Sequence, residues 1–491
     1  MIETTALIWP LLITGLAPLA IWLFRENINV REGVSLVAGA ITFAVVLTFV
    51  PPVLDGKILH YTLFTILPGI SIKLMVDGLT LIFAIVASFL WMLATFYNIG
   101  YMRSLNEHAQ TRYYFCFAVA IFGAEGVAMS GNILTLYFFY EVITVFTYPL
   151  VAHHQDEEAY HGARKYLVYL MGTSKLFLLP AMVLTYVLCG TLDFHLGDIA
   201  RGMFPPDANP LLVQITYALY VAGLAKAAIM PFHNWLPSAM VAPTPVSALL
   251  HAVAVVKAGV FSVSRILLSG FGVNLMDSLG LGTATAAFAA FTIVVASCIA
   301  LTKDDLKARL AYSTVSQLSY VVLGVSMLTP MAVTGGLAHI AHHAFSKITL
   351  FFAAGAIYVA THQKKISMLH GVGRRMPWTF GAFAVASLSM IGVPPVCGFV
   401  SKWYMVNGAV SSGHYIFLAA LLASTILNAS YFTPVIYKAF FYPPAPGVDL
   451  SKYSEAPLTM VVPLCFTAAV SVFLGLYPET FFQFINAFKG H

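Results

Sequence analysis

Long apolar runs separated by short polar segments follow one another along almost the whole chain. Most runs have about 20 residues, the length that an α-helix needs to cross the hydrocarbon core of a bilayer. Fourteen runs can be counted between charged residues, prolines and glycines, so the pattern predicts fourteen transmembrane helices. They cover residues 5–24, 33–53, 77–98, 113–130, 132–152, 164–189, 211–230, 243–268, 279–302, 308–328, 332–360, 379–408, 415–440 and 457–477.

Composition supports this interpretation and narrows the class of protein. Of 491 residues, 59% are hydrophobic and only 9% are charged, and the mean hydropathy is +0.85. A soluble domain carries about 25% charged residues, so a soluble enzyme, a disordered chain and a nucleic-acid-binding protein are excluded despite the net charge of +5. The longest predicted connection is 190–210, which leaves no room for a soluble domain. We therefore predict an all-α polytopic membrane protein.

The distribution of lysine and arginine predicts the orientation, because cytoplasmic loops are enriched in both. Fifteen of the 25 lie in loops after odd-numbered runs, and four lie in loops after even-numbered runs or in the tail. We expect both termini on the outer side of a prokaryotic inner (plasma) membrane. The first residues lack the basic segment of a cleaved signal, so the first run is expected to be retained.

Six basic residues fall inside predicted spans, where a charge at the bilayer centre costs about 2.5–3.5 kcal/mol. Arg265 lies near a span end and can snorkel to the interface. The others are Lys175, Lys226, Lys257, Lys347 and Lys402. They are expected to face the protein interior or water, as are the two acidic residues deep in spans, Glu125 and Glu141.

Two of these lysines lie beside predicted helix breaks. Lys226 precedes Pro231 in KAAIMPFHNWLP, and Lys402 follows the Pro394–Pro395 pair in IGVPPVCGFVSKW. Proline breaks the helical hydrogen-bond ladder, and broken helices in membranes line aqueous cavities. For Lys226 the alternative is snorkelling near a span end.

The two breaks fall in spans seven and twelve. An offset of five spans reverses orientation, as in inverted-topology repeats whose broken helices mark a transport site. We therefore predict helices 1–3 over residues 1–110 and a first five-helix repeat (helices 4–8) over 111–270. A second repeat (helices 9–13) is predicted over 271–441, followed by a loop and helix 14 over 442–491.

Histidines and lysines in two further spans predict a proton relay. His251 and Lys257 are six residues apart, which separates them by about 240° on a helix, so they are expected to point in different directions as successive stations. His339, His343 and Lys347 follow an i, i+4, i+8 spacing that aligns them on one face. Histidine exchanges protons near neutral pH. The H-x-x-x-H spacing could also bind zinc, but no third ligand lies nearby in the sequence.

Glu141 is the natural partner for one of the buried lysines. A pair about 4 Å apart at an effective dielectric constant of about 20 is worth about 4 kcal/mol. Breaking such a pair would help a desolvated lysine release its proton, so the pair could act as a switch. The alternative is a buried structural salt bridge.

Together, Glu141 and the strings KAAIMPFHNWLP, APTPVSALLHAVAVVKAGVF, HIAHHAFSK and GVPPVCGFVSKW resemble the antiporter-like subunits shared by respiratory complex I, Mrp cation/proton antiporters and membrane-bound group 4 hydrogenases. The motifs occur in order over about residues 75–440. The resemblance implies a fourteen-helix core with two inverted five-helix repeats, discontinuous helices 7 and 12, and a proton path along the membrane midplane.

The resemblance also implies roles for individual residues. Glu141 and Lys226 would form the switch pair, and Lys402 would be the terminal proton donor. The connecting relay would consist of His251, Lys257, His339, His343 and Lys347. It assigns no role to Lys175 or Glu125.

Several functions stay open at this point. We favour the D-type subunit of an Mrp antiporter or an Mrp-derived module, because the chain ends about fourteen residues after the last span and lacks the lateral helix of the largest members. The M-type proton-pumping subunit of complex I (NADH-quinone oxidoreductase) or of a membrane-bound hydrogenase is the alternative. A stand-alone secondary transporter of a small solute is a further one, disfavoured because only two carboxylates lie deep in spans.

The expected partners and cofactors follow from the same residues. We expect other membrane subunits, the lipid bilayer, H⁺ and possibly Na⁺ as partners, and no nucleic acid. The five cysteines lie in apolar runs without a C-x-x-C pair, which argues against iron–sulfur ligation, thiol redox chemistry and a disulfide framework. No metal, redox site or other cofactor is expected in this chain, although it could belong to an oxidoreductase complex.

Overall fold

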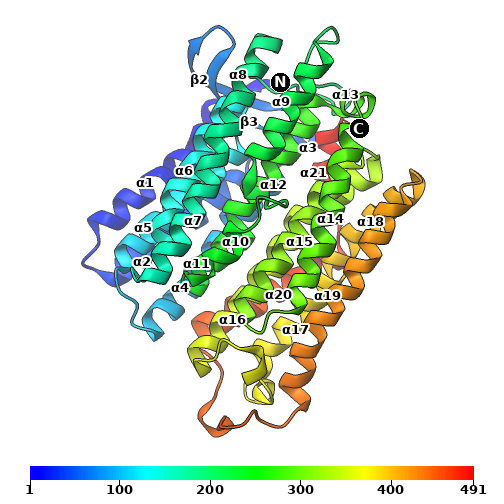
Figure 1. The fold of residues 1–491 in the computed structure, drawn as a ribbon. Coiled ribbons are helices and arrows are strands. Elements are labelled where there is room, and N and C mark those ends of the chain that lie inside the picture. Colours follow the sequence, from blue (N-terminus) through cyan, green and yellow to red (C-terminus); the bar gives the residue numbers. More distant parts are fainter. Residues whose placement is uncertain (491) are drawn as a thin grey trace.

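Helices account for most of the computed structural model, which describes residues 1–490 (Figure 1). The long helices run side by side, and both termini lie at the same end of the bundle (Figure 1). The α-helices are α1 (Ile8–Leu23), α2 (Ile28–Leu47), α3 (Val50–Leu54), α4 (Gly78–Ser104), α5 (Gln110–Ala128), α6 (Ile133–Val151), α7 (Glu157–Thr173), α8 (Leu179–Cys189), α9 (Pro210–Gly223), α10 (Trp235–Ser238), α11 (Thr244–Ala248), α12 (Val255–Arg265), α13 (Val273–Ser278), α14 (Leu281–Leu301), α15 (Leu306–Ser326), α16 (Pro330–Thr361), α17 (Pro377–Ile391), α18 (Cys397–Ser411), α19 (Tyr415–Phe441), α20 (Leu458–Leu476) and α21 (Glu479–Lys489).

Short segments of other helical types join several of these helices. The π-helical segments are η2 (Ser174–Leu178), η5 (Leu249–Val253) and η6 (Ile266–Phe271). The 3₁₀ segments are η1 (Thr5–Leu7), η3 (Ala225–Ala227), η4 (Ala239–Val241), η7 (Ile366–Met368), η8 (Val372–Arg374) and η9 (Leu450–Lys452). Two of the π-helical segments carry residues that stand out in the sequence, Lys175 in η2 and His251 in η5.

The helices agree with the predicted polytopic membrane fold. Within residues 1–490, ten helical stretches are long and apolar enough to cross a membrane, by length and composition. Two shorter apolar helices, α9 and α17, are the first halves of the helices predicted to break. Every one of the fourteen predicted ranges falls on a helical stretch, so the predicted count is consistent with the structure.

Spans seven and twelve are discontinuous, as predicted. After α9 the chain runs through η3 and an irregular segment to the four-residue helix α10, in the region of Pro231. α17 ends at Ile391, and Gly392 follows with φ +94°, a conformation that glycine adopts without a steric penalty. Pro394 and Pro395 then delay the next helix, α18, until Cys397.

A small β-sheet departs from the all-α prediction. The connection between the second and third spans forms β2 (Leu59–Leu67) and β3 (Ile70–Val76), an antiparallel hairpin that turns at Gly69. β1 (Ile2–Glu3) pairs with β2 in parallel. The β-branched and aromatic residues of LHYTLFTIL and ISIKLMV favour strands. The sheet lies at the end of the bundle that holds both termini (Figure 1).

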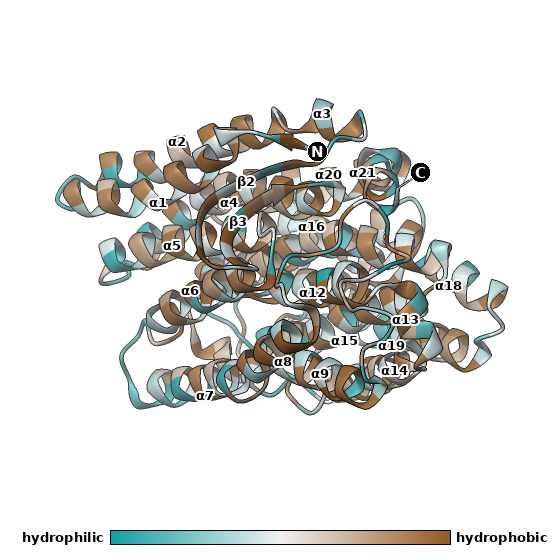
Figure 2. Cartoon of the chain, turned by 90° about the horizontal axis from the view of Figure 1, so that it is seen from above, coloured by the Kyte–Doolittle hydropathy of each residue, from teal (hydrophilic) through white to brown (hydrophobic). Residues whose placement is uncertain are grey.

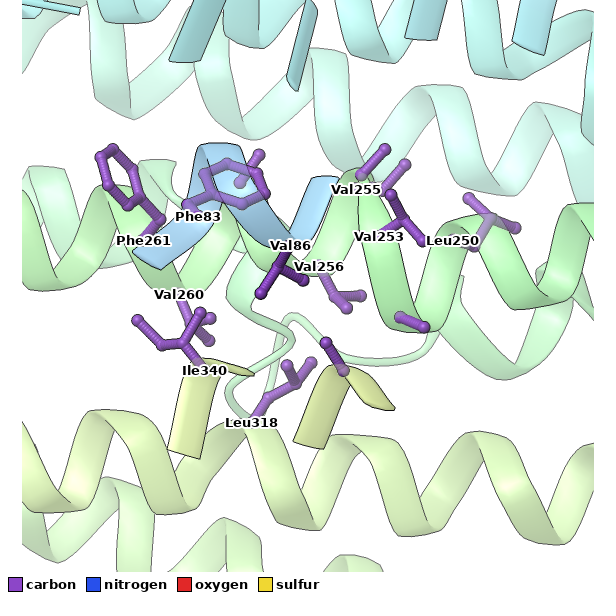
Figure 3. Close-up of a cluster of buried hydrophobic side chains, with 14 of the residues drawn as sticks. Phe83, Val86, Leu250, Val253, Val255, Val256, Val260, Phe261, Leu318 and Ile340 are labelled. Atoms are coloured by element: carbon purple, nitrogen blue, oxygen red, sulfur yellow. The ribbon is translucent and has the colours of Figure 1, made fainter. Parts of the chain in front are cut away.

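Hydrophobic side chains fill the centre of the bundle. Figure 2 shows that hydrophobic residues dominate the helices, whereas hydrophilic residues gather in the connecting loops. The close-up in Figure 3 shows Phe83 of α4, Val256 and Val260 of α12, Leu318 of α15 and Ile340 of α16 converging on one cluster. All five side chains are fully buried. The adjacent polar residues Lys257, Gln317 and His339 are likewise buried, so they lie next to this hydrophobic cluster in the interior of the bundle.

Arg265 differs from the prediction that it snorkels at a span end. Its side chain is fully buried, and its guanidinium donates to both carboxylate oxygens of Asp77 at 2.5 and 2.8 Å. This bidentate pair joins the end of α12 to the start of α4, where Asp77 also caps the helix through Thr80 N. A basic side chain snorkels when the membrane interface is the only place where its charge can be solvated. Here Asp77 offers Arg265 a carboxylate partner inside the protein instead.

Candidate functional site

The predicted relay residues Lys257, His343 and His339 lie in contact across two helices. Lys257 Nζ of α12 lies 2.6 Å from His343 Nδ1 of α16. His343 and His339 are one turn apart on α16, with ring centroids 6.0 Å apart and nearly parallel planes. All three side chains are almost completely buried. Three titratable groups are therefore lined up in the buried interior of the bundle.

His339 extends this line towards α18 and α15. Its Nδ1 lies 2.8 Å from Ser401 Oγ, and its Nε2 lies 3.0 Å from Gln317 Oε1. The next residue along α18 is Lys402, whose Nζ lies 4.6 Å from the ring centroid of Tyr320. The Tyr320 ring lies 5.6 Å from that of His339. His339 and Lys402 are thus linked by two residues: Ser401, which precedes Lys402 and contacts His339, and Tyr320, whose ring lies near both side chains.

Lys402 holds the end of the broken helix α17. Its Nζ donates to Met390 O at 2.5 Å and to Ile391 O at 3.2 Å. These carbonyls belong to the last turn of α17 and have no partner within that helix, since the chain leaves the helical path at Gly392. A cation at this position also complements the negative end of the helix dipole. Lys402 therefore lies between the break in span twelve and the neighbourhood of His339.

His251 and Lys347 lie beside this line rather than within it. The His251 ring lies 4.6 Å from that of Phe351 on α16, and neither ring nitrogen has a hydrogen-bond partner in residues 1–490. Lys347 Nζ donates to Ser313 Oγ of α15 at 2.5 Å. The spacing of His251 and Lys257 predicts different directions, but both contact α16. The π-helical segment η5 changes the angular spacing between them, which a regular 100° step does not describe.

Lys226 occupies the first helix break and is held by α6. Its Nζ donates to Tyr140 O at 2.8 Å and to Thr144 Oγ1 at 2.7 Å, and lies 3.1 Å from the centroid of the Tyr140 ring. A Cβ added to Gly259 of α12 would lie 2.3 Å from the carbonyl carbon of Lys226. Glycine at this position therefore lets α12, which carries Lys257, pack directly against the break.

Glu141 makes its ion pair with Lys175 and not with the expected partner Lys226. Glu141 Oε2 lies 3.4 Å from Lys175 Nζ, which also donates to Tyr137 Oη at 2.7 Å. Glu141 follows Tyr140 by one position, so its side chain points about 100° away from the face of α6 that holds Lys226. The Lys175 side chain is 48% exposed and that of Glu141 is 13% exposed. Lys175 is therefore not buried within this chain, contrary to the prediction for lysines in spans.

A cavity of about 710 Å³ opens at the end of the bundle opposite the β-sheet. Its walls include Thr244 at the start of α11, Lys307 at the start of α15 and Tyr358 near the end of α16. Thr244 precedes His251 by seven residues, or about 10 Å along a helix. The cavity thus reaches towards the helices that carry the histidines and lysines.

Sequence reasoning missed the side chains that link the predicted residues. Gln317, Ser401 and Ser313 bond His339 and Lys347, but buried hydroxyl and amide groups are common in membrane helices and carry no distinctive spacing. The pairing of Lys175 with Glu141 had a usable signal, since both lie near the middle of adjacent spans. Glu125 on α5 is buried, and neither carboxylate oxygen has a hydrogen-bond partner in the described part of the chain.

Comparison with known structures supports the fold. The chain superposes on a chain of the Mrp complex from Dietzia sp. DQ12-45-1b with a TM-score of 0.84 and 20% identity, covering 99% of this chain and 97% of that one. It superposes on a chain of the membrane-bound sulfane sulfur reductase, an archaeal respiratory membrane complex, with a TM-score of 0.85 and 25% identity, covering 98% and 96%.

Comparison of sequences identifies relatives of two kinds. The N subunit of NADH-quinone oxidoreductase from Desulforudis audaxviator is 33% identical over 429 residues, which are 84% of this chain and 83% of the relative. The A/B subunit of a probable K⁺/H⁺ antiporter from Rhizobium meliloti is 32% identical, and the match covers 91% of this chain but only 45% of that longer protein. Residues 130–428, which hold all eight predicted site residues, match the family described as NADH:quinone oxidoreductase/Mrp antiporter, TM. The chain therefore belongs to the NADH:quinone oxidoreductase/Mrp antiporter transmembrane family, as an antiporter-like integral membrane subunit.

Proposed function

We propose that this protein translocates protons through the line Lys257–His343–His339–Lys402 as part of a multisubunit membrane complex. The observation that carries the proposal is the 2.6 Å contact between Lys257 and His343, two side chains buried in the interior of the bundle. A fixed structural charge in such a place needs a counter-charge, because an unpaired buried ion is costly. Two bases that share one proton satisfy each other instead and can pass it on.

The bases at the centre are nitrogen groups, which favours H⁺ over Na⁺ as the ion that moves along this line. Hard cations prefer oxygen ligands, and the histidine and lysine nitrogens offer protons a series of exchange sites. The stand-alone transporter of a small solute finds less support, since the relatives with printed functions are subunits of oxidoreductases and cation/proton antiporters. An Mrp-type or Mrp-derived module remains our first choice, with a proton-pumping subunit of complex I or of a membrane-bound hydrogenase as the alternative.

Glu141 supplies the switch in this proposal. Its carboxylate pairs with Lys175, whereas the adjacent Tyr140 holds Lys226 through its carbonyl oxygen. Both lysines therefore lie beside the same turn of α6. We infer that the carboxylate exchanges between the two lysines during transport. Its departure from one lysine favours release of that lysine's proton, and its arrival stabilises the charged form of the other.

The position of the Glu141–Lys175 pair supports a neighbouring subunit. Both residues lie near the middle of their spans, and nearly half of the Lys175 side chain is exposed on the surface of this chain. A charged group facing lipid at that depth is costly. Another membrane subunit covering this part of α6 and η2 would remove the exposure, in keeping with the complexes to which the relatives belong.

Access from water fits the expected topology. The 710 Å³ cavity lies at the end of the bundle where the loops carry most of the lysines and arginines, which we expect to be cytoplasmic. The termini and the β-sheet would then lie outside. The breaks near Lys226 and Lys402 support the predicted repeats over 111–270 and 271–441, with the proton path running between them.

The direct test is proton movement by the native complex reconstituted into vesicles that contain a pH-sensitive dye. Lys257→Met keeps the length of the side chain but cannot carry a proton, so translocation is expected to be lost while the complex still assembles. Lys57→Met, in an exposed loop, is the matched control and is expected to retain activity. Normal translocation by Lys257→Met would contradict the proposal. Identification of the companion subunits, with tests of Na⁺ and K⁺ dependence, distinguishes the antiporter from the oxidoreductase alternatives.

A further inference from the structure

Three histidines surround one carboxylate at the end of the bundle opposite the β-sheet. Glu107 and His108 lie between α4 and α5, and His153 and His154 lie between α6 and α7. Glu107 Oε2 lies 3.5 Å from His153 Nε2, 3.9 Å from His154 Nδ1 and 4.0 Å from His108 Nδ1. Ligand atoms of Glu107, His108 and His153 all lie within 4.8 Å of one another. The mechanism proposed above uses none of these four side chains.

His153 is the member whose surroundings are hardest to explain without a ligand. Its side chain is 0% exposed, and apart from the Glu107 carboxylate 3.5 Å from Nε2, neither ring nitrogen has a polar partner in residues 1–490. Buried polar atoms in native proteins nearly always have a partner. Its ring lies 4.7 Å from that of His108 and 5.7 Å from that of His154, centroid to centroid. This buried ring, whose Nδ1 has no partner in the described chain, is thus held within the cluster.

Three of these side chains, Glu107, His108 and His153, have the spacing of a metal site, and His154 is the nearest candidate for a fourth ligand. With metal–ligand bonds of 2.0–2.2 Å, neighbouring ligand atoms in a tetrahedral zinc site are about 3.4 Å apart. Glu107 Oε2 lies 3.5–4.0 Å from one nitrogen of each histidine, and the ligand atoms of Glu107, His108 and His153 lie within 4.8 Å of one another, so binding would draw these atoms together.

The backbone around the ligands is unusual as well. Asn106, Ala109 and Gln155 flank them with φ values of +49°, +49° and +59°, half of the non-glycine residues with positive φ in the described chain. Such conformations are costly and tend to be retained at functional positions.

We propose that Glu107, His108, His153 and His154 form a binding site for a divalent transition metal of the Zn²⁺ class. Three imidazoles and one carboxylate suit Zn²⁺, whereas Mg²⁺ and Ca²⁺ prefer all-oxygen ligands. The site departs from our expectation of no metal, which considered spacing along the chain. Its ligands come from two loops that only the packing of α4, α5 and α6 brings together.

The proposed metal site borders the large cavity. Glu107 and His154 also line the 710 Å³ cavity that reaches the start of α11. A bound cation would place positive charge at the mouth of this cavity and hold its two loops together. Resting on the proposed function, we infer that Zn²⁺ at this site slows proton uptake from the cavity.

The binding test uses the purified full-length protein without a histidine tag, stripped with a chelator and then equilibrated with ZnCl₂. Metal analysis is expected to find one tightly bound Zn²⁺ per chain. His108→Ala and His154→Ala change partly exposed side chains and are expected to weaken binding at least tenfold. His161→Ala, an exposed histidine of α7 on the same cavity, is the matched control and is expected to bind as the native protein does. Binding below 0.2 Zn²⁺ per chain, or binding that survives both His108→Ala and His154→Ala, would overturn the site.

The regulatory step is tested separately in vesicles containing the native complex. Added Zn²⁺ is expected to slow translocation in the native complex, and His108→Ala is expected to shift the required concentration upwards at least tenfold. Stoichiometric binding without any slowing would keep the site and overturn its regulatory role. A complex that moves no protons under any condition would contradict the proposed function and leave the binding result standing.

Discussion

Replacement of Lys402 by arginine separates a proton station from a fixed charge. Lys402 donates to Met390 O and Ile391 O at the end of α17. Arginine keeps the positive charge and can donate to the same two carbonyl oxygens, so the cap on α17 is expected to survive. However, the ordinary pKa of arginine lies about 2–3.4 units above that of lysine. Removing a proton from arginine therefore needs about 3–4.6 kcal/mol more free energy than removing one from lysine. If Lys402 must deprotonate in each cycle, Lys402→Arg should slow translocation by about 100-fold or more.

Lys402→Ala provides the comparison, because it removes both the proton and the cap. Met390 O keeps a hydrogen bond from Asn428 Nδ2 at 3.1 Å, but Ile391 O loses its lysine donor. An unsatisfied buried carbonyl costs about 1–3 kcal/mol, so this variant should also unfold at a lower temperature. The assay is proton translocation in vesicles, with assembly checked by gel filtration and stability by thermal unfolding. Near-normal translocation by Lys402→Arg together with failure of Lys402→Ala would refute the relay assignment and leave a fixed charge.

Three further changes test other parts of the structure. Glu141→Ala should abolish translocation with assembly intact and Glu141→Asp should retain part of it, whereas normal pumping by Glu141→Ala would make the carboxylate merely structural. Gly259→Ala should lower the free energy of unfolding by about 1–3 kcal/mol and impair transport, because the methyl group of the introduced alanine would collide with the backbone of Lys226. An unchanged unfolding temperature would contradict this packing. Asp77→Ala leaves the buried charge of Arg265 without its carboxylate partner and should lower the free energy of unfolding by about 3–5 kcal/mol. Thermal unfolding of Asp77→Ala, compared with that of Asp77→Asn, would measure this loss.

The linear sequence was sufficient to predict the spans, the helix breaks and most of the basic groups in the centre. Apolar runs of the required length predict spans because insertion depends on local hydrophobicity. Pro231 and the Pro394–Pro395 pair predict the breaks because the restrictions that proline places on the backbone act locally. Lys257 and Lys402 stand out because a charge in a span is costly wherever it lies, and this cost needs no knowledge of its neighbours.

The partners of these groups depended on how the helices pack. Glu141 bonds Lys175 because adjacent positions on α6 face different neighbours. The π-helical segment η5 turns both His251 and Lys257 towards α16, against the spacing of a regular helix. The histidine cluster near Glu107 joins two loops that are more than forty residues apart in the chain. Periodicity and insertion cost are properties of one segment, whereas a contact is a property of two segments and exists only once their relative position and rotation are set.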